Sequence, residues 1–370
     1  MNLKLNPLSA PLPGKVLPFL QAEFWAQFKS DFGWRSLPFA LDFAPDSTAP
    51  SISTELRVLV RRLAGPLCFA YVPGGPAIDC PASSRSDLLT ALGTALKPHL
   101  PPSCILIRFD APWCEEDGSG ADSPDQPSPD RVTMVHRPVF EKPLRKAASD
   151  VQPPDTVLLS LEAGEEELLA AMKPKWRYNI KLAAKKGVIV TEEGVEALPL
   201  FYELYEETSL RDHIAIHPRK YYERLFARAR ALSGPEAPDL RLWVARHEGE
   251  ALAAIITLYF GRTATYLYGA SSDLKREYMP SYALQWAAIR AARESGCADY
   301  DFYGIPPNDD PAHPMAGLYR FKTGFGGRVL HYAGSWDLVL SPLLYGGWQA
   351  AEALRKFWFK DLRKRSLRKP

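Results

Sequence analysis

The stretch Thr263-Ala264-Thr265-Tyr266-Leu267-Tyr268 is rich in β-branched and aromatic residues, which predicts a β-strand in the second half of the chain. The apolar run Leu252 to Phe260 precedes it and predicts a second strand paired with the first. A helical pattern then covers Ser281 to Ser295, and a short strand at Tyr300 to Tyr303 ends at Gly304-Ile305-Pro306. This segment therefore has the order strand, strand, helix, strand.

The first half of the chain has the same order of elements. Apolar runs at Leu56 to Val60 and Leu67 to Val72 predict paired strands, and a helical pattern covers Ser84 to Lys97. The apolar run Cys104 to Phe109 then predicts a strand that ends at Asp110-Ala111-Pro112. Both halves therefore contain one similar unit.

The two units also have nearly the same length. Tyr71 to Pro112 and Tyr266 to Pro306 differ by one residue, which indicates a duplication. Strands mixed with helices that return to a shared sheet predict α/β domains. A chain of 370 residues is long enough for two such domains, each with its own core. Prolines interrupt the charged segment Glu141 to Asp155, so we place the boundary there and predict domains 1–150 and 151–334.

The composition is that of an ordinary globular protein, with 46% hydrophobic and 24% charged residues. The net charge of +2 is too small to indicate a nucleic-acid protein by itself, so any polyanion site depends on local clusters of basic residues. Five cysteines without CxxC spacing argue against a disulfide framework and a zinc site, and they favour a reducing compartment. The histidines have no ligand spacing, so we predict no metal site. Because no signal peptide or membrane span is visible, we expect a cytoplasmic protein.

A cationic motif lies near the C-terminal end, in Leu318-Tyr319-Arg320-Phe321-Lys322-Thr323-Gly324-Phe325-Gly326-Gly327. It places Lys322 among aromatic residues beside a glycine-rich turn. When an amine attacks an ester carbonyl, the tetrahedral intermediate carries a negative oxygen that a fixed cation stabilises. A lysine with an ordinary pKa of about 10.4 is charged at neutral pH, which makes Lys322 a candidate for this task. The alternative is a surface lysine on a helix that ends at Gly324.

Two tyrosines mark a second candidate site. Tyr266 and Tyr268 are two residues apart on an expected strand, so their side chains should share one face. Two phenols on one face can bind phosphate or peptide groups. The alternative is ordinary core packing of alternating aromatic residues.

A basic helix is the third candidate. Its fourteen residues contain no acidic side chain and include Lys173, Lys175, Arg177, Lys181, Lys185 and Lys186. Spacing by four puts Arg177, Lys181 and Lys185 on one helical face, which suits a phosphate backbone. The alternative is a helix face that only improves solubility. Trp176 could either stack on a base or lie buried under the helix.

Together, the motif around Lys322, the strand end Tyr266 to Ser271 and the basic run Lys173 to Gly187 resemble the Fem family of peptidoglycan bridge-forming aminoacyltransferases, which includes FemA, FemB and FemX. The resemblance covers nearly the whole chain. It implies two tandem acetyltransferase-like (GNAT) domains, each with a mixed, mainly antiparallel sheet flanked by helices. It also implies that the C-terminal stretch 335–370 returns to pack on the first domain.

The resemblance implies a reaction as well. Enzymes of this family take an amino acid from aminoacyl-tRNA and attach it to a cell-wall precursor, so aminoacyl-tRNA would be the co-substrate and no other cofactor is expected. The motif's lysine, here Lys322, is assigned to the transition state, and the preceding Phe321 lines the acceptor channel. The strand tyrosines Tyr266 and Tyr268 belong to the acceptor site. The basic helix would contact tRNA through Lys173, Lys175, Arg177, Lys181 and Lys185.

Further acceptor contacts follow from the same resemblance. Lys29 and Asp110 match positions that contact the nucleotide-linked acceptor in FemX-like enzymes. Family members commonly carry an arginine four residues before a helical tyrosine, which is Tyr221 here. In this chain His217 occupies the arginine's position, and Arg219 is the nearest alternative. Because histidine has an ordinary pKa near 6.5, it holds a phosphate less firmly at neutral pH, and the acceptor could differ accordingly.

Two other functions stand as alternatives. GNAT acetyltransferases hold the pyrophosphate of acetyl-coenzyme A in a glycine-rich loop, but the corresponding loop Lys275 to Ser281 has no glycine and Pro280 removes one amide donor. A noncatalytic protein that binds RNA or a membrane surface is the second alternative. The tail Arg355 to Pro370 has eight basic residues and one acidic residue, interleaved with aromatic residues, which suits tRNA or anionic lipid.

The acceptor itself has two candidate forms. It is either the soluble UDP-MurNAc-pentapeptide or its lipid-linked form, lipid II. In the second case the basic tail would hold the protein at the inner face of the membrane. The sequence leaves open which amino acid is transferred, how many are added, and the oligomeric state.

Overall fold

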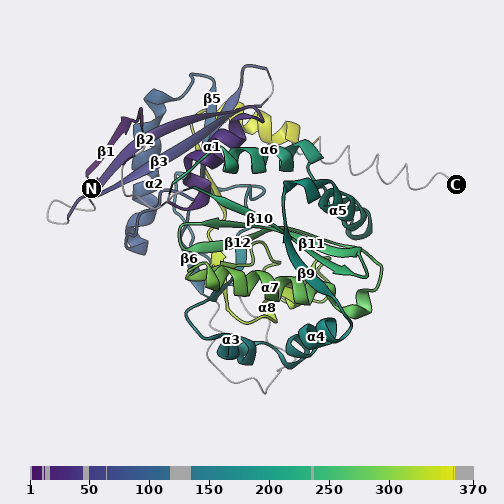
Figure 1. The fold of residues 1–370 in the computed structure, drawn as a ribbon. Coiled ribbons are helices and arrows are strands. Elements are labelled where there is room, and N and C mark those ends of the chain that lie inside the picture. The colour runs from purple at the N-terminus through teal and green to yellow at the C-terminus, as the bar shows by residue number, and fades with distance from the viewer. Residues whose placement is uncertain are drawn as a thin grey trace.

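The computed structural model describes residues 2–10, 12, 17–44, 50–63, 65–116, 135–234, 237–352 and 354, and it contains two β-sheets with helices around them (Figure 1). The first sheet has the order β1 (Asn2–Pro7), β2 (Trp34–Ala44), β3 (Ile52–Arg62), β4 (Cys68–Pro73), β5 (Cys104–Asp110), β15 (Ser335–Val339) and β7 (Leu144–Lys146). The second has the order β6 (Cys114–Glu116), β14 (Arg328–Tyr332), β8 (Asp155–Ser160), β13 (Asp299–Asp301), β12 (Thr263–Ser271), β11 (Glu250–Phe260), β10 (Asp239–His247) and β9 (Ile189–Glu193).

The two sheets share one topology. In the first, β1 to β4 pair antiparallel, helix α2 (Ala82–Leu96) follows, and β5 returns parallel to β4. In the second, β9 to β12 pair antiparallel, helix α7 (Pro280–Glu294) follows, and β13 returns parallel to β12. The predicted duplicated unit of an α/β fold is therefore confirmed, and the duplication includes two further strands before each predicted pair.

Helices form where apolar residues recur at helical spacing, and their apolar faces cover the sheets. On α2, Leu88, Leu92 and Leu96 are fully buried in the core of the first sheet. On α7, Leu284 and Ala288 are buried in the core of the second sheet. Each buried leucine contributes about 1.5 to 3 kcal/mol relative to an exposed one. These contacts fix the helix that connects the two parallel strands in each half.

The remaining helices cover both faces of the second sheet. On one face lie α5 (Leu198–Asp212) and α6 (Arg219–Arg230), and on the opposite face lie α3 (Glu165–Ala171), α4 (Pro174–Lys185), α7 and α8 (Ala316–Thr323) (Figure 1). The expected basic helix is thus confirmed as α4. In the described residues, short 3-10 helices lie at η1 (Phe19–Gln21), η2 (Lys97–His99), η4 (Val195–Ala197) and η5 (Arg276–Tyr278).

Helix α1 (Glu23–Ser30) lies between the two halves, next to α6 (Figure 1). Its Ala26 packs against Trp34 of the first sheet. Phe24 and Phe28, which point elsewhere on the same helix, are buried in the core beneath α5 and α6. A salt bridge between Arg228 and Asp31, 2.6 Å long, adds a polar contact at the end of α1. The helix therefore places its last residues where the two halves meet.

The two halves exchange strands. Strand β15 comes from the C-terminal part of the chain but lies between β5 and β7 in the first sheet, where Arg108 and Asp337 form a buried ion pair at 2.7 Å. Strand β6 comes from the first half but pairs with β14 in the second sheet. Residues 335–339 therefore lie in the first sheet.

Several expectations concern features that the structure describes only in part. The basic tail Arg355 to Pro370 lies outside the described residues. None of the helices within the described ranges has the length and apolar character needed to cross a membrane. The same ranges contain no group of three or more histidine, cysteine, aspartate or glutamate side chains that could hold a metal ion.

Candidate functional site

The second sheet opens at one end of its parallel strand pair. Strands β12 and β13 pair only from Thr263 to Thr265, whereas β4 and β5 in the first sheet stay paired to their ends at Pro73 and Asp110. Strand β12 continues to Ser271, and in the described part of the chain this extension pairs only with β11. The two central strands of the second half therefore diverge beyond Thr265 and Asp301.

A β-bulge changes the direction of the tyrosines on β12. Tyr268 pairs with Ile256 while Tyr266 pairs with Thr257, so Leu267 is an extra residue on this strand. As a result, Tyr266 packs with the core on the α7 side of the sheet, and Tyr268 packs with the core on the α5 and α6 side. The expectation that the two tyrosines share one face is therefore wrong, because one added residue reverses the alternation.

Lys322 lies on α8 with 5% of its surface exposed. Its Nζ donates hydrogen bonds to the carbonyl oxygens of Phe302 at 2.6 Å, Tyr303 at 3.3 Å and Gly304 at 2.9 Å, and it lies 4.8 Å from the centre of the Tyr266 ring. An ammonium group has three N–H donors. All three are directed to backbone oxygens, so the lysine holds the loop that follows β13.

Burial controls the charges around this lysine. It lowers the pKa of Lys322 to about 7, although the nearby carboxylate of Asp301 favours the charged form. Burial also raises the pKa of Asp301, whose carboxylate accepts hydrogen bonds from the Thr156 hydroxyl and from the Tyr303 N–H at 2.8 Å. The expectation of an ordinary lysine pKa is therefore wrong, because the side chain is desolvated.

Tyr303 has an unusual backbone conformation. It was expected to end a strand, but β13 ends at Asp301 and Tyr303 is left-handed, with φ of 56°. For a bulky residue this conformation costs on the order of 1 to 3 kcal/mol and persists only where neighbours hold it. Here Lys322 and Asp301 hold its backbone, and its hydroxyl donates a hydrogen bond to Gln152 Oε1 at 2.5 Å. Strain retained in this way marks Tyr303 as a candidate functional residue.

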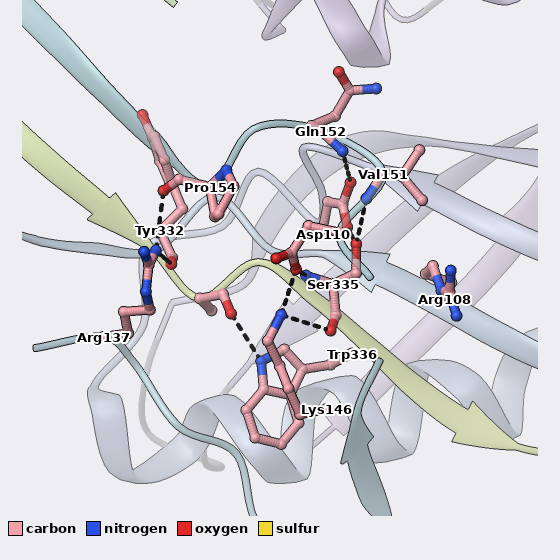
Figure 2. Close-up of polar contacts among 12 residues, drawn as sticks. Arg108, Asp110, Arg137, Lys146, Val151, Gln152, Pro154, Tyr332, Ser335 and Trp336 are labelled. Atoms are coloured by element: carbon pink, nitrogen blue, oxygen red, sulfur yellow. Dashed lines mark hydrogen bonds and ion pairs between the residues drawn. The ribbon is translucent and has the colours of Figure 1, made fainter. Parts of the chain in front are cut away.

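Asp110 lies at the end of β5, the strand that corresponds to β13 in the first half. Its carboxylate accepts hydrogen bonds from the Tyr71 and Ser335 hydroxyls and from the Gln152 N–H at 3.3 Å, and Figure 2 shows the contacts of Ser335 and Gln152. Burial raises the pKa of Asp110. Because these donors occupy both carboxylate oxygens, Asp110 joins β4, the linker between the halves and β15.

Lys29 lies at the end of α1, where the first half meets α6. Its Nζ is 5.4 Å from the centre of the Trp25 ring and 5.6 Å from that of Tyr221. Burial, assisted by the Arg61 guanidinium, lowers the pKa of Lys29 to about 8. The His217 ring stacks on Tyr221 with 3.8 Å between ring centres, and burial together with Lys29 lowers its pKa. At neutral pH the site therefore presents a lysine cation beside an uncharged histidine.

Tyr221, which contacts this cation, belongs to a group of protonated phenols. Burial raises the pKa of Tyr221 to about 12 and raises those of Tyr268 and Tyr303 as well, so all three hydroxyls keep their protons at neutral pH. Tyr221 and Tyr268 share a hydrogen bond between their hydroxyl groups. Arg219 instead pairs with Glu223 at 3.0 Å on the exposed side of α6. The structure therefore places His217, and not Arg219, against the phenols.

The structure brings most of the candidate residues into two adjoining groups. The first group lies between the halves and consists of Lys29, Asp110, His217, Tyr221 and Tyr268. The second lies on the α7 side of the second sheet and consists of Tyr266, Phe321 and Lys322. Tyr303 connects them, because its backbone contacts Lys322 and its hydroxyl donates to Gln152, whose N–H donates to Asp110 of the first group.

Residues 15–228 and 243–353 match the model of the FemAB family. The chain belongs to this family. It is 25% identical over 382 residues to lipid II:glycine glycyltransferase from Staphylococcus saprophyticus and 24% identical over 387 residues to the Staphylococcus aureus protein of that name, covering 88% of this chain and 89% of each relative. The crystal structure of FemX superposes with a TM-score of 0.67 at 20% identity, over 89% of this chain and 94% of FemX. The tandem acetyltransferase-like fold is thereby confirmed.

The basic run at helix α4 of this FemAB protein has five exposed lysines, including Lys186. We name the four that were predicted to contact tRNA the α4 lysine cluster: Lys173, Lys175, Lys181 and Lys185. Arg177 differs, because its Nη1 donates hydrogen bonds to the carbonyls of Ala170 at 3.0 Å and of Met172 at the end of α3. Its guanidinium is half-buried and is therefore removed from the predicted basic face. Trp176 is buried, and its Nε1 donates to the Phe321 carbonyl at 2.9 Å, so it does not stack on a base.

The loop that would hold acetyl-coenzyme A has a different construction in this FemAB protein. Lys275 and Met279 are both left-handed, with φ of 48° and 57°, and Pro280 is the first residue of α7. Tyr278 and Met279 pack against the core beneath α7. Lys275 pairs with Glu250 at 3.1 Å. Side chains therefore occupy this helix start, which does not favour the acetyl-coenzyme A alternative.

The FemAB site also contains residues that the sequence patterns did not indicate: Arg61, Tyr71, Gln152 and Tyr303. Tyr71 could have been predicted from the sequence, because it corresponds in the first unit to Tyr266 in the second. Tyr303 was hidden by its position in an aromatic run that resembles a strand. No sequence pattern marks Gln152 or Arg61, because each acts through contacts with distant parts of the chain.

Proposed function

We propose that this protein is an aminoacyltransferase that moves an amino acid from aminoacyl-tRNA to the stem-peptide amine of a peptidoglycan precursor, building the interpeptide bridge. Membership of the FemAB family supports this, as do relatives named lipid II:glycine glycyltransferase. The observation that carries the proposal is the contact of Lys29 from the first half with Tyr221 from the second, whose hydroxyl shares a hydrogen bond with that of Tyr268. A cation among protonated phenols suits the phosphate and peptide groups of such an acceptor.

The reaction needs no covalent bond to the protein. The acceptor amine nitrogen attacks the ester carbonyl of aminoacyl-tRNA, a carbon–nitrogen bond forms, and the bond to the ribose oxygen breaks. One proton leaves the amine and one proton reaches the ribose oxygen, so atoms and charges balance. Hydrogen-bond donors at the carbonyl oxygen lower the barrier as that oxygen becomes negative. The phenols of Tyr221 and Tyr268 supply such donors in this proposal, and Lys322 holds the loop that follows β13.

We place the tRNA on the α4 lysine cluster. The four lysines are exposed, and the run from residue 173 to residue 186 contains no acidic side chain. A surface with only positive charges attracts a phosphate backbone, whereas a helix that is merely solvated usually mixes both signs. Helix α4 also adjoins α8, since the Lys173 N–H donates to the Gly324 carbonyl at 3.0 Å. The cluster therefore lies on the same side of the sheet as Lys322.

We propose lipid II as the acceptor and the inner face of the membrane as the place of action. The names of the relatives support lipid II. In the C-terminal helical segment, Leu343 is 90% exposed and Leu354 is 69% exposed, and the chain continues into the tail with eight basic residues. Exposed leucines next to basic residues favour the surface of an anionic membrane.

Mass spectrometry of the acceptor tests the proposed function. The protein is incubated with a pool of charged tRNAs and with either UDP-MurNAc-pentapeptide or lipid II in vesicles, and the mass of the stem peptide is measured. We expect a gain of one or more amino-acid residues on lipid II, with uncharged tRNA as the control. A gain that requires acetyl-coenzyme A, or no gain with any charged tRNA, would show that the proposal is wrong.

A further inference from the structure

We propose that Tyr303 orients the attacking amine of the acceptor, through a hydrogen bond from the amine to the phenol oxygen. The proposal rests on the aminoacyltransferase function proposed above. It assigns Lys322 a positioning role that acts through Tyr303, in place of direct contact with the reacting carbonyl. Three observations support it, namely the backbone of Tyr303, the direction of its hydroxyl and the position of its ring.

The backbone of Tyr303 is held from two sides. Its N–H donates to Asp301 Oδ1 at 2.8 Å, and its carbonyl is one of three that accept from Lys322 Nζ. The other two carbonyls belong to Phe302 and Gly304, which flank it. Left-handed φ at a tyrosine is costly, and these contacts supply the restraint that keeps it. The side chain is therefore fixed in direction by its backbone.

The hydroxyl of Tyr303 has a defined role as an acceptor. Its single proton is donated to Gln152 Oε1 at 2.5 Å, and burial raises its pKa, so the phenol does not ionise at neutral pH. A hydroxyl that has used its proton still has lone pairs that accept. An amine nucleophile carries N–H donors, so the free lone pairs of Tyr303 match it. The Gln152 N–H in turn donates to Asp110, which fixes the glutamine.

The ring of Tyr303 lies where the halves meet. Its hydroxyl is within electrostatic range of Asp110 from the first half and of Tyr221 and Tyr268 from the second. Its ring centre lies 6.3 Å from that of Phe19, which precedes α1. Tyr303 as a whole is half-buried, so part of its surface is accessible. An amine at this oxygen would have the donors of the second half on one side.

The contacts of Lys322 Nζ with three carbonyls support an indirect role for the lysine. To contact a negative oxygen directly, Lys322 would have to release one of three carbonyls at 2.6 to 3.3 Å. Without the lysine, these carbonyls lose their common donor and the left-handed Tyr303 loses a restraint. The effect of Lys322 on transfer is therefore transmitted by the position of Tyr303.

Binding of two acceptors to Tyr303→Phe tests the first part of the proposal without requiring turnover. We expect lipid II to bind the variant more weakly by on the order of five- to tenfold, the scale of one hydrogen bond, and lipid II with its stem amine trimethylated, which has no N–H donor, to bind both proteins equally. Tyr300→Phe is the control, because it removes a buried hydroxyl that donates to Gln285 at 2.9 Å, and it should change neither affinity. Equal loss for both acceptors would refute contact with the amine.

A double-mutant cycle tests the second part. If Lys322 acts through Tyr303, the rate losses of Lys322→Met and Tyr303→Phe will be strongly non-additive, and the double variant will be little slower than Lys322→Met alone. If Lys322 contacts the carbonyl directly, the two losses will multiply, and the proposed positioning role is wrong. A wild-type protein that binds lipid II with this amine dependence but transfers nothing would overturn the proposed function and leave the amine contact standing.

Discussion

Replacing Lys322 by methionine should change how the stability of the protein depends on pH. The pKa of this lysine falls from 10.5, its ordinary value, to about 7 in the folded protein because of burial. Between these two values the unfolded chain binds one proton more than the folded chain, so stability rises with pH. The contribution is complete above pH 10.5 and is lost as pH falls through 7. Methionine fills similar space without a titrating group.

The size of the effect follows from the shift. Each pH unit in this window changes the free energy of unfolding by about 1.4 kcal/mol. Between pH 7 and pH 9 the free energy of unfolding of the wild-type protein should therefore rise by about 2 to 3 kcal/mol relative to that of Lys322→Met. The variant also loses the hydrogen bonds to the carbonyls of residues 302–304, which lowers its stability at every pH and leaves the slope unchanged.

Urea unfolding followed by tryptophan fluorescence at pH 7, 8 and 9 measures this difference. Lys181→Met, which alters an exposed lysine on α4, is the matched control and should remain parallel to wild type. The titration of Lys29, with a pKa of about 8, is common to all three proteins and cancels. If the difference in the free energy of unfolding between wild type and Lys322→Met is the same at pH 7, 8 and 9, the reasoning is wrong. Such a result would mean that the three carbonyls keep the lysine charged despite its burial.

Three further predictions concern other parts of the molecule. Changing the α4 lysine cluster to glutamine should weaken tRNA binding and reduce its log–log salt slope by up to about three units, and an unchanged slope in a filter-binding assay would place the tRNA elsewhere. Deleting residues 355–370 should raise the KM for lipid II on anionic vesicles and spare the UDP-linked acceptor, with high salt mimicking the deletion; equal loss on both acceptors would contradict membrane contact. Gly269→Ala should destabilise by about 1 to 3 kcal/mol in thermal unfolding, because its Cβ would overlap the Tyr266 hydroxyl, and Tyr266→Phe should restore part of the loss. No restoration would show that the clash lies elsewhere.

The fold could be predicted from the sequence because its pattern is local and repeated. Apolar spacing on Leu88, Leu92 and Leu96 defines a helix without reference to the rest of the chain, and the equal spacing of the two units defines the duplication. The directions of Tyr266 and Tyr268 could not be predicted in this way. A bulge depends on how the neighbouring strand pairs, and that information lies outside the strand itself.

The candidate site was predictable where a motif carries the chemistry and not where tertiary contacts create it. Lys29 and Tyr221 were indicated by the family resemblance, and the structure brings them together. The backbone contacts of Lys322 and the strain at Tyr303 have no local signature, because three carbonyls and one lysine meet across about twenty residues. The lowered pKa of Lys322 could not be predicted either, because it results from burial, and burial depends on tertiary packing.

The strand exchange has a consequence for synthesis of the chain. Strand β15 completes the first sheet, yet almost 190 residues separate it from its neighbour β7. At ordinary ribosome speed the synthesis of these residues takes roughly ten to forty seconds. During this time the edges of β5 and β7 that pair with β15 have no partner strand. Exposed edges of this kind invite pairing with other chains. The nascent first half therefore depends on the last part of its own chain, and a ribosome that stalls before residue 335 would release an incomplete sheet.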